Sequence, residues 1–150
     1  MPTPKLYKHV LVAIDLTKQS DALLKYATTV AKLFKAKLSL IHVLSHTPIA
    51  YGGEFSIPVD IDLEQSIKKQ ASAELAKLGK KYGVAVKSQY VENGSIQMAI
   101  NQVAQKIKAD LIVVGTHSHR GLERLLGSQA NAILHSASCD VWVIRSRSRK

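Results

Sequence analysis

Hydrophobic residues follow two periods along this chain, one typical of buried strands and one typical of amphipathic helices. Short, mostly apolar runs favour strands that are covered on both faces, as in a parallel sheet. The predicted strands span residues 9–14, 37–44, 84–91, 110–114 and 140–144. Between the strands, apolar residues recur three and four positions apart. This spacing predicts four helices that each bury one stripe of side chains.

Each predicted helix has its own candidate core positions. Thr17 or Ser20 can cap the first helix and Ser95 the third, because their hydroxyls can accept from backbone N–H groups. The fourth helix is expected over residues 127–137. The expected buried stripes are Leu23, Tyr26, Ala27, Val30 and Phe34 in the first helix, Leu63, Ile67, Ala71, Leu75, Leu78 and Tyr82 in the second, Ile96, Ile100, Val103, Ala104 and Ile107 in the third, and Ala130, Ile133 and Leu134 in the fourth.

Strands and helices therefore alternate throughout, and the 150 residues have the size of one domain. Such alternation predicts an α/β fold with a parallel sheet, right-handed crossovers and helices on both faces. Two strand orders, 2-1-3-4-5 and 3-2-1-4-5, satisfy this pattern. In either order, a ligand would bind beyond the carboxyl ends of the strands, where the strand order reverses.

Composition narrows the class of protein. Hydrophobic residues make up 46% of the chain and charged residues 21%, which is typical of a folded domain. No apolar run approaches the ~20 residues of a membrane span, and the first residues lack the organisation of a signal peptide. The single Cys139 cannot form an intrachain disulfide. We therefore expect a cytoplasmic protein without a membrane partner.

A formal net charge of +10 is compatible with binding to nucleic acid. The basic residues are spread along the chain, and no aromatic residues are interleaved with them as in single-strand binding platforms. We therefore expect solvated basic faces, and nucleic-acid binding is retained only as a third interpretation that rests on charge.

The most informative segment follows the strand of residues 110–114. Gly115 ends that strand, donors such as His117 and Ser118 follow, and Gly127 and Ser128 open a helix. A strand, a polar loop and a helix N-terminus in this order expose backbone N–H groups that can meet an anion.

Asp15 follows the first strand. In the order 3-2-1-4-5, it would lie beside Gly115 and could accept hydrogen bonds from ribose hydroxyls or an adenine amine. The simpler interpretations are that the glycines serve turns and that Asp15 or Ser128 caps a helix. We expect no metal site, because His117 and His119 lack zinc-ligand spacing and a third ligand. No catalytic residue is predicted either.

The chain resembles universal stress proteins along essentially its whole length. The resemblance rests on residues 7–15, 38–43 and 109–115, on the Gly-Ser pair that opens the last helix, and on the final strand. It implies an open five-stranded parallel sheet in the order 3-2-1-4-5, the adenine nucleotide alpha hydrolase-like fold. It also implies a homodimer, commonly formed through the last strand, here with Val141 and Val143. The family contains members that bind ATP or AMP and members that bind no nucleotide.

The motif of the binding members, G-x2-G-x9-G-[ST], is matched in part. Gly115 takes the place of its first glycine, and Gly127 and Ser128 take the place of its closing pair. Ser118 stands where the second glycine belongs, and the stretch to Gly127 is one residue shorter. The resemblance implies that Asp15 contacts the nucleoside and that the backbone of Val43 meets adenine. It further implies that Ala13, Val114 and Gln129 pack nearby.

We therefore expect a homodimer of the cytoplasmic stress response that binds ATP or AMP, with or without Mg²⁺, and hydrolyses ATP very slowly at most. The alternative is a dimeric interaction module of the stress response that binds no nucleotide.

Overall fold

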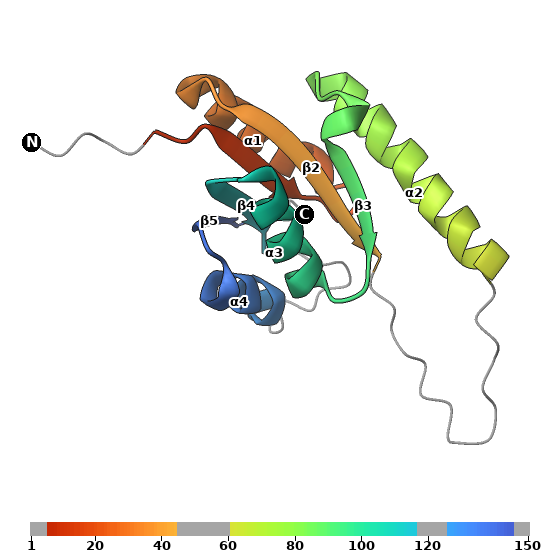
Figure 1. Ribbon diagram of the computed structural model, residues 1–150. Coiled ribbons are helices and arrows are strands. Elements are labelled where there is room, and N and C mark those ends of the chain that lie inside the picture. The colour runs from red at the N-terminus through yellow and green to blue at the C-terminus, as the bar shows by residue number, and fades with distance from the viewer. Residues whose placement is uncertain (1–5, 45–60, 117–125, 146–150) are drawn as a thin grey trace, which may run out of the picture.

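The structure is a computed structural model that describes residues 6–44, 61–116 and 126–145, with the backbone alone at residues 61 and 126–130. Its strands form one parallel sheet in the order β3-β2-β1-β4-β5 (Figure 1). The strands are β1 (His9–Ala13), β2 (Lys37–Leu44), β3 (Gln89–Asn93), β4 (Leu111–Gly115) and β5 (Asp140–Ile144). The helices are α1 (Ser20–Phe34), α2 (Ile61–Tyr82), α3 (Ile96–Ile107), α4 (Leu126–Ser136) and the short 3₁₀ helix η1 (Val86–Ser88).

This order confirms the expectation of a 3-2-1-4-5 sheet. Helices α1 and α2 pack on one face, and α3 and α4 pack on the other (Figure 1). Successive residues of a strand point to opposite faces, so β1 serves both layers. Val10 and Val12 join the cluster under α1 and α2, whereas Leu11 joins the cluster under α3 and α4. The central strand is thus buried on both sides, as its unbroken apolar run indicated.

Several predicted positions differ in the structure. Tyr26 is 41% exposed, because Leu24 takes its place beside the predicted Ala27 and Val30 on the buried face of α1. Leu63 and Ile67 are exposed at the N-terminal part of α2, and the core begins only at Ala71. Leu134 on α4 is also exposed. The predicted strand start at residues 84–88 is instead a short connection followed by η1.

Strand β3 begins later in the chain than predicted, at the point where its pairing with β2 starts. Gln89 is the first residue in register, opposite Leu40. Val84 is buried, whereas Val86 is 71% exposed. The alternation of apolar and polar residues that predicted a strand here therefore leads into the helix η1. The predicted cap of α3 is confirmed, since the Ser95 hydroxyl accepts a hydrogen bond from the Met98 N–H at 3.4 Å.

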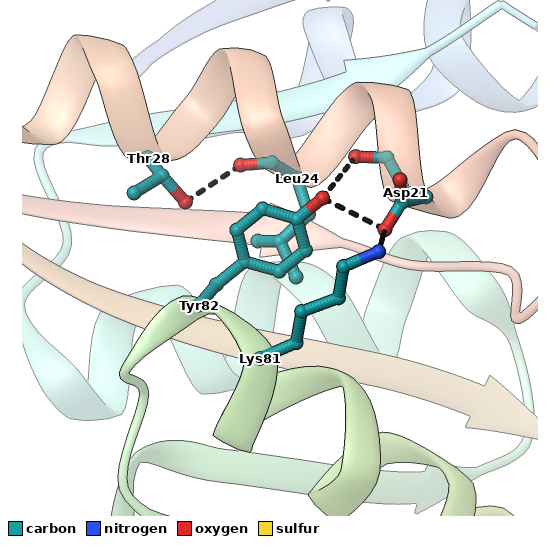
Figure 2. Close-up of polar contacts among 5 residues, drawn as sticks. All are labelled: Asp21, Leu24, Thr28, Lys81 and Tyr82. Atoms are coloured by element: carbon teal, nitrogen blue, oxygen red, sulfur yellow. Dashed lines mark hydrogen bonds and ion pairs between the residues drawn. The ribbon is translucent and has the colours of Figure 1, made fainter.

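A polar contact joins the first turn of α1 to the end of α2 (Figure 2). The Lys81 ammonium and the Tyr82 hydroxyl both donate to the Asp21 carboxylate, each at 2.7 Å. These two donors, Lys81 first, hold the pKa of Asp21 below its usual range. The first turn of α1, which follows the loop after β1, is therefore tied to the second helix of the same layer.

Within the described residues, no helix is both long and apolar enough to cross a bilayer.

Candidate functional site

The candidate site is built at the carboxyl ends of β1, β2 and β4. Paired residues place Ala13 beside Ile41 and Val12 beside Val113. Asp15 and Gly115 therefore follow two adjacent strands at one edge, as the strand order predicted. Because α4 connects the parallel strands β4 and β5, it runs antiparallel to them and its N-terminus faces this same edge.

The Asp15 carboxylate organises the loop between β1 and α1. Its Oδ1 atom accepts three hydrogen bonds: from the Thr17 N–H at 3.1 Å, the Thr17 hydroxyl at 2.7 Å and the Ser20 hydroxyl at 2.8 Å. The other oxygen, Oδ2, accepts no hydrogen bond from the described part of the chain. Asp15 is exposed, so Oδ2 is accessible to a ligand.

The predicted cap by Ser20 is wrong, whereas the Thr17 hydroxyl accepts a hydrogen bond from the Gln19 N–H at 3.3 Å in the turn that leads into α1. The residue before α1 is Gln19, whose side chain makes no cap hydrogen bond, and Ser20 is the first helical residue. Both hydroxyls also donate to the Asp15 carboxylate. The signal for this role was present in the sequence, since short polar side chains two and five positions after an Asp can donate back to its carboxylate.

Leu16 is strained, with a φ of +58° that residues other than glycine rarely adopt. The other positive φ values of non-glycine residues in the described ranges are at Lys35 and Lys108, where they end α1 and α3 in the common left-handed cap. Leu16 ends no helix, so its strain belongs to the loop that Asp15 organises. Backbone strain of this kind often accompanies a binding site.

Gly115 shows no structural need for a glycine. A Cβ added there would meet the Leu23 side chain at 3.5 Å and the Ile144 carbonyl oxygen at 4.0 Å, which are ordinary contact distances. By contrast, Gly83 and Gly94 adopt positive φ values in turns. The interpretation of Gly115 as a residue required by the turn therefore loses its support. What a glycine still provides at this strand end is open space beside the backbone.

His42, on β2, supports the end of β1 through a hydrogen bond. Its Nδ1 atom donates to the Ile14 carbonyl oxygen at 2.6 Å, since a carbonyl can only accept. The Ile14 N–H in turn donates to the Ile41 carbonyl at 2.8 Å. These two bonds fix the peptide that leads into Asp15, a support that the sequence analysis missed.

The remaining predicted site residues divide into two groups. Ala13, Val43 and Val114 lie at the same edge, but their side chains pack in the cluster under α3 and α4, which leaves only their backbones for a ligand. Gly127, Ser128 and Gln129 lie in the first turn of α4, where the backbone alone is described. His117 and Ser118 lie outside the described residues.

No three His, Cys, Asp or Glu side chains in the described ranges form a group that could hold a metal ion. The chemistry that the described residues offer at this edge is thus a carboxylate acceptor, an open backbone at Gly115 and the N-terminal end of a helix. Together these groups suit a ligand with both hydroxyl donors and a negative charge.

Comparison with solved structures supports the fold. The hypothetical protein MJ0577, solved for a structure-based assignment of biochemical function, has a TM-score of 0.78 at 20% identity, covering 97% of this chain and all of that one. A universal stress protein in complex with cAMP has a TM-score of 0.60 at 23% identity, covering 93% of this chain and 98% of that one.

Sequence comparison supports the family. "Universal stress protein A homolog 1" of Coxiella burnetii is 46% identical over 138 residues, which cover 92% of this chain and 96% of the relative. The sequence profile of the universal stress protein family matches residues 6–145, from before β1 to the end of β5. This chain therefore belongs to the universal stress protein family.

Proposed function

We propose that this chain binds an adenine nucleotide, ATP or AMP, at the carboxyl edge of its sheet, and that it acts in the cytoplasmic stress response as a homodimer. The observation that carries the proposal is Gly115, a glycine at the end of a central strand whose backbone geometry and packing do not require one. The structure of a related universal stress protein in complex with cAMP supports the choice of an adenine nucleotide.

In this proposal, Asp15 binds the nucleoside. Its Oδ1 atom is held by Thr17 and Ser20, which leaves Oδ2 to accept from a ribose hydroxyl or the adenine amine. A carboxylate would repel a phosphate, so the phosphates lie on the other side, toward Gly115 and the first turn of α4. The N–H groups and positive dipole end of that turn attract negative charge.

The other predicted residues complete the site. The backbones of Ala13, Val43 and Val114 border the base, and Gln129 lies beside Gly127 and Ser128 at the phosphates. His117 and Ser118 supply further donors. Mg²⁺, if bound, would accompany the phosphates of ATP.

Isothermal titration calorimetry of the purified protein with ATP and with AMP tests this site. We expect Gly115→Val and Asp15→Ala each to weaken binding about tenfold or more, because the first fills the space beside the backbone and the second removes the nucleoside acceptor. Glu74→Gln is the control, since it removes an exposed carboxylate on α2. Thermal melts establish that each variant is folded.

Unchanged affinity in both site variants would remove the site assignment. The absence of any binding heat with the unaltered protein, together with no nucleotide released on denaturation, would favour the interaction module that binds no nucleotide.

The proposed dimer uses the last strand. β5 pairs with β4 on one side and lies at the end of the strand order. Its residue Val143 is 37% exposed, and an apolar edge strand is a template for pairing with a second chain.

A further inference from the structure

A second candidate site lies at the opposite end of the sheet, where β2 and η1 begin. A groove of about 540 Å³ is bordered by the C-terminal end of α1, the first residues of β2 and the turn after α2. Small-molecule sites commonly have volumes of this size. The groove shares no lining residue with the carboxyl edge, so it is distinct from the proposed nucleotide site.

The charges that line this groove have one sign. Lys32, Lys35 and Lys37 contribute three ammonium groups, and no Asp or Glu is among the lining residues that the structure describes. No ion pair in the described ranges engages these lysines. The side chains that line the groove therefore carry a positive charge that attracts an anion.

The backbone at the end of α1 balances part of this positive charge. The N–H groups of Lys35 and Ala36 engage the terminal carbonyls of α1, with the Ala36 N–H 2.8 Å from the Ala31 oxygen. A helix C-terminus favours nearby cations, which explains Lys32 and Lys35 in part. It does not explain Lys37, which belongs to β2 and borders the same groove.

The groove also offers a hydroxyl and an apolar wall. Ser88 is only 5% exposed, and its hydroxyl makes no hydrogen bond within the described part of the chain. Leu38, Val84 and Tyr82 line the groove as well. Figure 2 shows Tyr82 beside α1, where its hydroxyl is held by Asp21 and its ring lies between Asp21 and Thr28, which is also a lining residue.

We propose that this groove binds a small organic phosphate, with its phosphate on the three lysines and the Ser88 hydroxyl, and its carbon body against Leu38, Val84 and the Tyr82 ring. Lysine binds phosphate as a compact charge, and the Ser88 hydroxyl can donate to a phosphate oxygen.

The test uses phenyl phosphate as the probe and inorganic phosphate for comparison, both measured by calorimetry at low salt. Phenyl phosphate binds more tightly than inorganic phosphate if the apolar wall contributes. The triple variant Lys32→Gln, Lys35→Gln, Lys37→Gln weakens phenyl phosphate binding about tenfold, as expected for the loss of three exposed charge contacts. Lys37→Gln alone, which leaves α1 unaltered, and Ser88→Ala each weaken binding by about twofold to threefold.

The matched control is Lys68→Gln, Lys69→Gln, Lys77→Gln, which removes the same charge from exposed positions of α2 outside the groove. This control and Gly115→Val leave phenyl phosphate binding unchanged. Equal weakening by both triple variants would overturn the proposal, because diffuse charge would then explain the binding. Loss of phenyl phosphate binding in Gly115→Val would also overturn it, by assigning the probe to the nucleotide site.

A third arm uses a 20-residue single-stranded DNA. If DNA binds through Lys32, Lys35 and Lys37 while phenyl phosphate does not bind, the groove is a nucleic-acid contact and the proposal is wrong. Failure of ATP to bind at the carboxyl edge would leave these expectations unchanged, because the two sites share no lining residue.

Discussion

At the scale of single residues, the polar side chains around β1 have divided roles. Asp15 directs one carboxylate oxygen to its own loop and leaves the other accessible, which allows one residue to shape the edge and to meet a ligand. His42 supports the preceding peptide through Ile14. A candidate site built in this way is preorganised, because its acceptor is already held in place before any ligand arrives.

Replacing Ser20 with Ala tests this brace. Ser20 is 4% exposed, and its hydroxyl donates to Asp15 and accepts from the Thr17 N–H. We expect Ser20→Ala to lower the free energy of unfolding by about 1 kcal/mol in urea denaturation, since a buried hydrogen-bonded hydroxyl is lost. Ser72→Ala, at an exposed position of α2, is the control and costs nothing. A Ser20→Ala protein as stable as the parent would contradict the brace.

His9 makes the stability depend on pH. Its Nδ1 atom donates to the Ile107 carbonyl at 3.1 Å, and in the neutral ring its Nε2 atom accepts from the Ser39 hydroxyl at 2.7 Å. Burial, with a further contribution from the Lys37 charge, lowers the pKa of His9 below its ordinary value of 6.5, against the raising effects of the Ile107 hydrogen bond and Asp110.

The sign of the effect follows from this lowered pKa. Below pH 6.5 the unfolded chain takes up a proton at His9 while the folded chain does not, until the lower pKa of the folded state is reached. We expect the free energy of unfolding to fall as the pH decreases through this window. Chemical denaturation between pH 7.5 and 5.5 measures the slope, which should be smaller in His9→Gln and unchanged in His135→Gln, an exposed control. Equal slopes in the parent and His9→Gln would refute this role.

At the scale of elements, the second helix shows that an apolar stripe does not by itself mean burial. The stripe of α2 extends from Leu63 to Tyr82, but only its C-terminal part lies on the sheet. Leu75 is fully buried under that part, whereas Leu63 is 57% exposed. The stability that α2 contributes is therefore concentrated toward its C-terminal end.

Two leucines of α2 test this division. We expect Leu75→Ala to cost about 2–5 kcal/mol of unfolding free energy, because it leaves a cavity in the core. Leu63→Ala should cost less than about 0.5 kcal/mol, as is usual for an exposed position. Urea denaturation of both variants measures the difference. Similar losses in the two variants would show that the N-terminal part of α2 is packed as firmly as the rest.

The sequence predicted which strands and helices form better than it predicted their buried residues and the order of the strands. Buried parallel strands leave a continuous apolar run, so β1, β2, β4 and β5 were located to within about one residue. The choice between Leu24 and Tyr26 as a core residue of α1 depends on how the helix is rotated against the sheet, which local spacing does not define. The strand order depends on long-range pairing, and only the family resemblance supplied it.

The candidate site was predictable only as far as it depends on where the strands end. Asp15 and Gly115 could be selected because each ends a predicted strand, and parallel strands end at one edge. The support by His42 could not, because it requires the register between β1 and β2. The role of Ser20 was mistaken for a helix cap, since the same residue type serves both purposes.

At the scale of the whole molecule, the sheet has two unlike ends. One carries Asp15, Gly115 and the N-terminus of α4, and the other carries the lysine groove. In our two proposals both ends bind anions, but only the first also offers a carboxylate acceptor for a nucleoside. Three of the lysines that contribute to the net charge of +10 border this groove.

The proposed dimer is tested by Val143→Lys. A charge at this half-exposed position of β5 should disfavour pairing through the last strand, because it would have to be desolvated. Sedimentation of the parent protein should give a dimer, and the variant should dissociate more readily on dilution. Val86→Lys, on η1, is the control. A Val143→Lys protein that remains as dimeric as the parent would place the interface elsewhere.

The most direct test of the central claim is a titration of ¹⁵N-labelled protein with AMP, followed by amide chemical shifts. The proposal predicts that the largest shifts occur at the carboxyl edge, in Leu16, Thr17, Gly115 and Thr116, and that they saturate. No shift at millimolar AMP, or shifts confined to the opposite end around Lys35 and Ser88, would contradict a nucleotide site at this edge.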